Sequence, residues 1–447
     1  MINLAVIGAG SAGLAMARYL SAHPKLFEFV VFEQGNEVGG TWIYDEGVSD
    51  DGVPCRFTNL THRELTALAD NDTIHSSMYK NLRTNLPKQV MEFPDFPFPE
   101  DCKTFPSHKD VLEYLKAYCG HFQLRQFIRF RTEVKHISPL LDGNYNRKGD
   151  LNVKWKVTTS DVNNTETINI YDAVVICNGH FSKPNLPSIP NIDIFSGSVV
   201  HSHFYKVPEP YYNMNVVVLG GRASGRDIAI EISQVAKSVY LSHNGQHGIS
   251  TLPENFIEKP SIKCIGENGD VVFEDGSQVK ADVIVYCTGY SFDFPFLDKS
   301  CGVSVSNGRV NPLYKHLFNA CFPSMSIIGV CNIVCPFQLF SMQARWILNV
   351  LTKEVSLPTY EEMLTDHNNE LGYKVKAGIP ERHFHRLSGD LQWEYYKTIS
   401  ELGKVKTIRN VVEKMYKFVA KDRELNILKY RDKEYEVIND DMFDVLQ

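Results

Sequence analysis

The sequence predicts an α/β protein built from two related domains, one of which is inserted in the other. Three observations lead to this prediction. The chain has 447 residues, roughly two to three times the usual size of a single domain. A strand, a glycine-rich turn and a helical pattern follow one another at the N-terminus, and the same succession returns near the middle of the chain.

The first unit begins with an apolar strand over residues 4–7 and continues into a helical pattern over 14–20. Between them, Gly8 makes a tight turn, Gly10 lets the backbone approach a pyrophosphate, and Gly13 lets the helix pack on the strand. The helix N-terminus then offers free N–H groups to the phosphate. This order predicts a Rossmann-like dinucleotide-binding domain.

The strand over 29–32 ends in Glu33, 20 residues after Gly13. A carboxylate there is placed to accept a hydrogen bond from a ribose 2′-hydroxyl, and the alternative is an exposed strand end. Gly40 and Trp42 follow within ten residues, and with Glu33 they resemble the FAD-binding half of flavoproteins that hold two dinucleotides. The alternative is a loop glycine pair beside a core tryptophan.

The second unit runs from the strand 216–219 into Gly220, Gly221, Arg222 and Ser224, ahead of a helix. Arg222 stands where the second glycine is usual, so Gly221 is expected to permit the close approach of a phosphate. The Arg222 guanidinium either binds a phosphate or is solvated at the surface.

The next strand, residues 238–241, ends in Ser242 and His243 without a carboxylate. A carboxylate would favour NAD and repel a 2′-phosphate, so its absence favours NADP, although it also fits a degenerate site. The segments 173–180 and 283–290 are strands that end in glycine, and we interpret them as the crossovers between domains. The predicted FAD-binding domain spans 1–206 and 292–447, and the inserted NADP-binding domain spans 207–291.

Residues 195–205, Phe-Ser-Gly-Ser-Val-Val-His-Ser-His-Phe-Tyr, match F-x-G-x-x-x-H-x-x-x-[YFW], the identifying pattern of the class B flavin monooxygenases. The final Tyr205-Lys206 resembles the flavin-containing monooxygenase branch, because Baeyer–Villiger enzymes would show Trp-Pro there. Residues 78–87 resemble the family's segment with an active-site asparagine, which maps to Asn85.

The resemblance continues towards the C-terminus. Gln343 lies in a segment that resembles the helix returning to the flavin domain, although Met342 stands where Glu is frequent. The segment 391–396 and the acidic C-terminus, without a hydrophobic anchor, look most like the soluble insect enzymes that include the pyrrolizidine alkaloid (senecionine) N-oxygenases.

The resemblance implies that NADPH reduces FAD, that O₂ adds at flavin C4a, and that the hydroperoxide oxygenates a tertiary amine or thioether. The protein's part is to exclude water from the flavin. Asn85 is the candidate hydrogen-bond donor near the flavin or the nicotinamide, and the alternative is a turn residue. The cofactor-binding candidates are Gly8, Gly10, Gly13, Glu33, Gly40, Trp42, Asn85, Gly220, Gly221, Arg222, Ser224, Ser242, His243 and Gln343.

Composition limits the other functions. With 46 Lys and Arg against 53 Asp and Glu, the net charge of −7 offers no field for nucleic acid. Apolar runs fall far short of a membrane span, and no signal peptide is visible, so we expect a soluble protein, cytoplasmic or, if a leader is removed, secreted. The cysteines lack the spacing of a zinc site. The sequence is compatible with a homo-oligomer as well as with a monomer.

Two other classes were weighed. A pyridine nucleotide disulfide reductase would share both domains, but it needs a close pair of redox cysteines, and only Cys55 follows the first glycine turn before Cys102. A regulatory flavoprotein that holds FAD and NADP without turnover is the other alternative.

Overall fold

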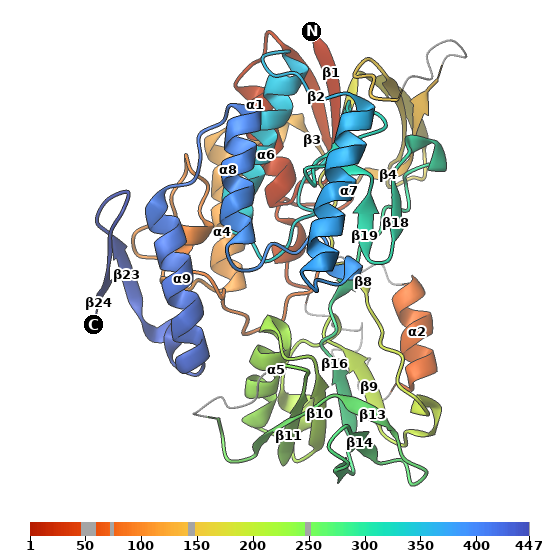
Figure 1. Ribbon diagram of the computed structural model, residues 1–447, viewed down its shortest axis with the longest axis vertical. Helices are drawn as coiled ribbons and strands as arrows, with labels where there is room; N and C mark the ends of the chain where they lie inside the picture. The colour runs from red at the N-terminus through yellow and green to blue at the C-terminus, as the bar shows by residue number, and fades with distance from the viewer. Residues whose placement is uncertain (46–59, 72–75, 142–147, 246–251, 447) are drawn as a thin grey trace.

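The computed structural model describes residues 1–45, 60–71, 76–141, 148–245 and 252–446. The chain forms a larger lobe around a mixed sheet and a smaller lobe around a parallel sheet (Figure 1). Strands of the mixed sheet, in sheet order, are β20 (Leu313–Tyr314), β21 (Phe318–Asn319), β22 (Met325–Ile327), β7 (Ala173–Ile176), β1 (Ile2–Ile7), β2 (Phe27–Phe32) and β3 (Ile128–Arg129).

Strand β1 is buried on both faces because its successive side chains point to opposite sides of the sheet. Leu4 and Val6 pack in the core formed with the helices, whereas Ala5 and Ile7 pack in the core formed with an antiparallel sheet on the other face. The helices of the first core are α1 (Ser11–Ser21), α4 (His108–His121), α6 (Pro336–Leu351) and α8 (Leu391–Gly403). The antiparallel sheet consists of β4 (Glu133–Leu140), β5 (Lys154–Ser160) and β6 (Glu166–Tyr171).

Further elements surround this lobe. They are the helices α3 (Lys88–Met91), α7 (Tyr360–Lys376) and α9 (Asn410–Leu425), the hairpin β18 (Ser304–Ser306) and β19 (Arg309–Asn311), and the C-terminal hairpin β23 (Glu434–Val437) and β24 (Phe443–Leu446). Helices α4 and α7 each begin with a capping box. In these boxes, the side-chain oxygens of Ser107 and Thr359 accept hydrogen bonds from the backbone N–H three residues later.

The smaller lobe has a fully parallel sheet whose neighbouring strands are β12 (Phe256–Lys259), β11 (Ser238–Ser242), β10 (Asn215–Leu219), β16 (Val283–Tyr286) and β9 (Ser198–His201). Helix α5 (Ala223–Ser233) packs against β11, and α2 (His62–Asn71) packs against β9. The strands β13 (Ile262–Ile265), β14 (Val271–Phe273) and β15 (Gln278–Val279) form a meander beside it.

The two passages of the chain between the lobes pair with each other. They are β8 (Lys183–Pro184) and β17 (Tyr290–Ser291), which form an antiparallel ribbon. The sequence analysis places the start of the inserted domain at residue 207, but β9 ends at His201 and pairs with β16 inside the smaller sheet. The sheet therefore begins before the expected boundary, and the crossing point lies at the β8–β17 ribbon.

Candidate functional site

The first glycine turn lies at the carboxyl end of β1, beside the end of β7. Gly8 has φ +103°, and a Cβ on it would lie 2.6 Å from the Cys177 carbonyl oxygen. A Cβ on Gly13 would lie 1.8 Å from the Gly8 carbonyl oxygen. The turn and the start of α1 are therefore packed so tightly that neither glycine can be replaced without movement of the backbone.

Gly10 faces the second glycine pair. A Cβ on Gly10 would lie 3.5 Å from the Gly40 Cα, and the Gly39 N–H donates to the Ala9 carbonyl over 3.1 Å. The structure thus brings the Gly39–Gly40 turn against the first glycine turn, and the binding of one cofactor by both turns stays a prediction. Trp42 is half-buried beside the helical core. Gly10 and Gly40 leave a narrow backbone cradle that fits a pyrophosphate at the N-terminus of α1.

Glu33 lies at the carboxyl end of β2 and holds this turn. Its Oε2 accepts from the Ala9 N–H over 2.8 Å, and its Oε1 accepts from the Gly35 N–H over 2.7 Å. Each carboxylate oxygen has a further lone pair, so Glu33 can also accept from a ribose hydroxyl. The residue has both a structural and a candidate binding role.

The second turn repeats the geometry of the first at the carboxyl end of β10. Gly220 has φ +121°, and a Cβ on it would lie 2.4 Å from the Cys287 carbonyl oxygen. A Cβ on Gly225 would lie 1.6 Å from the Gly220 carbonyl oxygen. The two turns share the same packing between strand, glycine and helix, so both have the form of a dinucleotide site.

Gly221 differs from the expectation. A Cβ on Gly221 would lie 2.6 Å from the His243 ring, so this glycine makes room for an imidazole of its own chain. His243 in turn contacts Glu258, with 3.3 Å between Nε2 and Oε1. Ser242 is fully buried, and its hydroxyl donates to the Pro260 carbonyl over 2.8 Å. The carboxylate of Glu258, which belongs to β12, therefore does lie near the carboxyl end of β11.

Arg222 is the N-cap of α5 and is exposed, as is Ser224 in the first turn of that helix. Arg222 lies close enough to Arg386 and His383 of the larger lobe for its charge to act on both. Burial, followed by the charges of Arg222 and Arg382, lowers the pKa of Arg386 to about 10. Burial, together with the charges of Arg386, Arg222 and Arg382, lowers the pKa of His383 to about 4. These residues form the arginine cluster: Arg222, Arg382 and Arg386.

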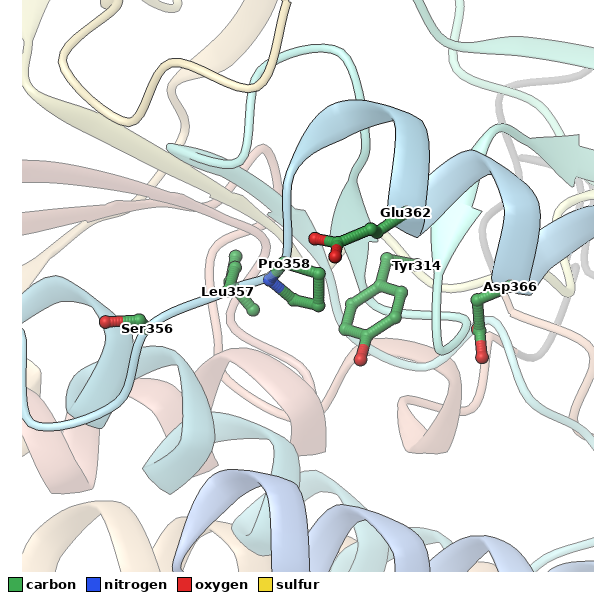
Figure 2. A pocket seen from close by; sticks show the side chains of 6 residues that line it. All are labelled: Tyr314, Ser356, Leu357, Pro358, Glu362 and Asp366. Carbon is green, nitrogen blue, oxygen red and sulfur yellow. The ribbon is translucent and has the colours of Figure 1, made fainter.

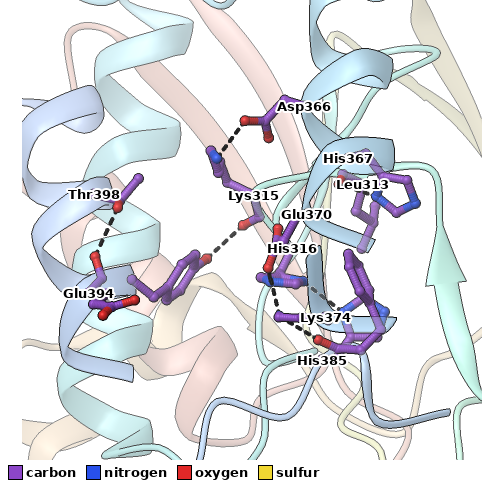
Figure 3. A network of polar contacts seen from close by, with 12 residues as sticks. Leu313, Lys315, His316, Asp366, His367, Glu370, Lys374, His385, Glu394 and Thr398 are labelled. Carbon is purple, nitrogen blue, oxygen red and sulfur yellow. Dashed lines mark hydrogen bonds and ion pairs between the residues drawn. The ribbon is translucent and has the colours of Figure 1, made fainter. Parts of the chain in front are cut away.

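The segment that carries Arg386 is held by a buried polar network around His385 (Figure 3). The Val310 N–H donates to His385 Nε2 over 2.9 Å, so the His385 proton sits on Nδ1 and is donated to His316 Nδ1 over 2.9 Å. His316 Nε2 then donates to Glu370 over 2.9 Å, and Lys374 pairs with the same carboxylate over 2.6 Å. The pairing with His316 and Lys374 overcomes burial and lowers the pKa of Glu370. The network ties α7 to the segment that carries Arg386.

Two residues of the 195–205 motif have structural roles. His201 is fully buried, accepts from the His203 N–H through Nδ1 and donates to the Gly289 carbonyl through Nε2, both over 3.1 Å. It thereby fixes the end of β9 to the crossover glycine after β16. The Tyr205 ring contacts the Tyr79 ring edge-on, with 5.6 Å between ring centroids.

Asn85 lies where the two lobes meet. Leu82 packs against the core of the smaller lobe, whereas Leu86 packs against cores of the larger lobe. The Asn85 side chain is half-buried and has no hydrogen-bond partner among the described residues. Its neighbour Thr84 is fixed, because its N–H donates to the Pro106 carbonyl over 2.9 Å. The amide is therefore held on a constrained backbone and remains available to a ligand.

Gln343 lies in the middle of α6. It is fully buried, and its Nε2 donates to the Tyr395 hydroxyl of α8 over 3.1 Å. Met342 is buried in the helical core. The structure thus places Gln343 in the packing between two helices, and its expected contact with a cofactor stays a prediction.

A shallow pocket of about 470 Å³ opens elsewhere on the larger lobe (Figure 2). It is lined by Tyr314, Ser356, Leu357, Pro358, Glu362 and Asp366, none of which the sequence analysis selects. The carboxylate of Asp366 is paired with Lys315 over 2.7 Å. This pocket does not join the glycine turns. Cys55, which the sequence analysis weighs, lies outside the described residues.

Sequence reasoning missed Arg386 and Arg431. Arg431, near the C-terminus, binds Asp227 of α5 through its two terminal guanidinium nitrogens, Nη1 and Nη2. A single arginine in a region without a motif gives no signal of this kind. Across the described ranges, no helix is long and apolar enough to cross a membrane. The same ranges contain no group of His, Cys, Asp or Glu side chains arranged to hold a metal ion.

Known proteins match almost the whole chain. A flavin-binding monooxygenase-like family matches residues 64–255 and 250–430, and an NAD(P)-binding Rossmann-like domain matches 6–71. The Arabidopsis thaliana flavin-containing monooxygenase FMO GS-OX-like 2 is 37% identical over 431 residues, which cover 93% of this chain and 87% of that protein.

Solved structures agree with the sequence matches. S-allyl-L-cysteine S-oxygenase from Allium sativum superposes with a TM-score of 0.85 at 34% identity, covering 97% of this chain and 95% of that one. Tmm from Pelagibacter sp. strain HTCC7211 superposes with a TM-score of 0.80 at 25% identity, covering 100% and 96%.

Proposed function

Because the chain belongs to the flavin-containing monooxygenase family, we propose that it oxygenates the sulfur or nitrogen of small, soft nucleophiles with NADPH and O₂. FAD and NADPH are its cofactors. The observation that carries the proposal is the pair of glycine turns with one geometry, each at the carboxyl end of a parallel strand in its own lobe.

The two turns receive different cofactors in this proposal. Gly8, Gly10, Gly13, Glu33, Gly40 and Trp42 would hold FAD in the larger lobe, and Gly220, Gly221, Arg222, Ser224 and His243 would surround NADPH in the smaller lobe. Arg222 and Arg386 supply positive charge for phosphate, and Arg386 Nε has no hydrogen-bond partner among the described residues. Reduced flavin supplies the activation of O₂. The protein binds both cofactors and excludes water.

Asn85 is the proposed hydrogen-bond donor to the cofactors. The support is its place between the lobes and its amide, which has no protein partner among the described residues. No base is needed on the substrate, because the lone pair of a sulfide or amine is itself the nucleophile. Asn85 would therefore act on the oxygen-activating side of the reaction.

Thioethers are the substrates we favour. The relatives include an S-allyl-L-cysteine S-oxygenase that matches 97% of this chain. Tertiary amines, including pyrrolizidine alkaloids, are the second substrate class, and they rest on the resemblance of the segment 391–396 to insect N-oxygenases.

The test is a substrate panel. Purified FAD-loaded protein is mixed with NADPH, O₂ and either S-alkyl cysteines, simple thioethers, tertiary amines or pyrrolizidine alkaloids, and S-oxide, N-oxide, NADPH and H₂O₂ are measured together. We expect S-oxide in amounts close to the NADPH consumed. Bound FAD and NADPH without oxygenated product from any compound would instead indicate a regulatory flavoprotein.

A further inference from the structure

The C-terminal segment reaches across to the smaller lobe through one side chain. Arg431 Nη1 and Nη2 donate to the two carboxylate oxygens of Asp227 over 3.1 and 2.5 Å. The two side chains are only 18% and 17% exposed. A two-pronged pair of this kind fixes both distance and orientation, and its partial burial protects it from solvent screening.

The same guanidinium also holds the Asn85 segment. Arg431 Nε donates to the Thr84 carbonyl over 2.9 Å, one residue before Asn85. Arg83 Nη2 donates back to the Arg431 carbonyl over 2.7 Å. Arg431 thus binds α5 of the smaller lobe and the backbone of Thr84, next to Asn85, at once. We call Asp227, Arg431 and Thr84 the Arg431 bridge.

The backbone that carries Arg431 is packed into the larger lobe. Tyr430, next to Arg431, is buried and contacts Phe105 edge-on with 5.3 Å between ring centroids. On the other side of the Asn85 segment, the Lys80 N–H donates to the Lys206 carbonyl over 3.0 Å, and Lys206 Nζ donates to the Met78 carbonyl over 3.2 Å. The segment 78–85 is therefore fastened at both ends between the lobes.

We propose that Arg431 is a positioning residue that sets the place of the smaller lobe relative to Asn85. This inference rests on the proposed function, because it assigns to one arginine the alignment that NADPH and Asn85 would need in the same site. Without the bridge, α5 and its Arg222 N-cap could shift while both glycine turns stay intact. Displacement of about 1 Å at a reacting centre can cost up to roughly a hundredfold in rate.

The experiment compares Arg431→Gln, Arg431→Lys, Asp227→Asn and the Arg431→Gln/Asp227→Asn double variant with Arg409→Gln. Arg409 is the matched control, because it pairs with Asp440 over 2.8 Å on the exposed surface of the C-terminal region. FAD content, melting temperature, the NADP⁺ dissociation constant and product formed per NADPH are measured for each protein.

We expect Arg431→Gln to retain FAD, to weaken NADP⁺ binding on the order of tenfold, and to release more H₂O₂ per NADPH. Asp227→Asn should show the same defect, the double variant should be no worse than Arg431→Gln, and Arg431→Lys should recover part of the loss. Arg409→Gln should match the wild type.

Unchanged NADP⁺ binding and product yield in Arg431→Gln and Asp227→Asn, whatever their melting temperatures, would overturn the proposal. Additive defects in the double variant would do the same, because the two side chains would then act separately. A wild-type protein that binds NADP⁺ but forms no oxygenated product would contradict the proposed function alone, since NADP⁺ affinity still reports on the bridge.

Discussion

At the residue scale, different constraints require glycine at different positions of the same motif. Gly13 is fixed by the protein itself, since its Cβ would lie 1.8 Å from the Gly8 carbonyl oxygen. A Cβ on Gly10 would meet only backbone atoms of Gly40, the Cα at 3.5 Å and the N at 3.9 Å, both ordinary contact distances. We therefore propose that the requirement for glycine at position 10 comes from the cofactor.

This difference predicts opposite outcomes for two alanine variants. Gly10→Ala should fold with a melting temperature near that of the wild-type apoprotein but should lose most of its FAD, because the methyl group occupies the path of the pyrophosphate. Gly13→Ala should lower the stability of the apoprotein itself. Flavin absorbance and thermal unfolding of FAD-stripped protein measure the two effects separately, and tight FAD binding by Gly10→Ala would contradict this assignment.

The prediction for Asn85 concerns product yield. Asn85→Ala should leave FAD bound and reducible by NADPH, because neither glycine turn is changed. The loss of one donor in a closed site typically costs about 3 kcal/mol, or roughly two orders of magnitude in rate. We therefore expect NADPH consumption to continue while H₂O₂ replaces oxygenated product. An Asn85→Ala protein with wild-type product per NADPH would show that Asn85 is only a turn residue.

At the element scale, the strand–turn–helix units were predictable and their surroundings were not. The glycine spacing of 8–13 predicts the strand β1 and the helix α1, because local backbone geometry alone demands it. The role of Gly221 was not predictable, because it depends on His243, which lies 22 residues later and reaches the turn only through the pairing of β10 and β11. Contacts made by the fold lie outside what a local pattern can show.

The link between β9 and the crossover after β16 gives a pH prediction. Burial, reinforced by the charge of His203, lowers the pKa of His201 to about 3. The folded protein thus binds fewer protons than the unfolded chain, so the stabilising effect of neutral His201 is complete above pH 6.5 and is lost as the pH falls towards 3. Each pH unit in this window removes about 1.4 kcal/mol.

The measurement is the free energy of unfolding of wild type and His201→Gln between pH 7 and 4.5. The free energy of unfolding of the wild type should fall towards that of His201→Gln below pH 6.5, by about 1.4 kcal/mol per pH unit. The variant lacks this pH dependence because glutamine can donate to the Gly289 carbonyl but does not titrate. His23→Gln, at an exposed histidine, is the control. A stability difference that stays constant with pH would contradict the neutral, buried state of His201.

At the scale of the whole molecule, the sequence predicted two nucleotide-binding lobes with one inserted in the other, and the structure confirms the two α/β lobes. The connection between the lobes could not be predicted. Asp227 and Arg431 are 204 residues apart and belong to no shared motif, so only the folded chain shows that they meet. Arg222 and Arg386 are likewise distant in the sequence, and only the folded chain brings them close enough for the charge of Arg222 to lower the pKa of Arg386.

The arginine cluster gives the last prediction, because it draws positive charge from both lobes of a protein whose net charge is −7. Arg222 stands on α5, whereas Arg382 and Arg386 follow α7 in the larger lobe. Like charges held together favour a bound anion that neutralises them, and the phosphates of NADPH are such an anion. Removing one of these arginines should therefore weaken NADPH binding more than it changes the fold.

We expect Arg386→Gln to raise the KM for NADPH by about tenfold, since a hydrogen bond to a charged group is worth about 1.5–3 kcal/mol, with little change in kcat at saturating NADPH. Arg222→Gln should narrow the preference for NADPH over NADH, because NADH lacks the 2′-phosphate. Added salt should raise the KM of the wild type more than that of either variant, as the screening length falls to about 3 Å at 1 M. Arg409→Gln serves again as the control. If added salt raised the KM for NADPH equally in the wild type and both variants, the arginine cluster would not contact the cofactor phosphates. Another anion would then have to neutralise its positive charge.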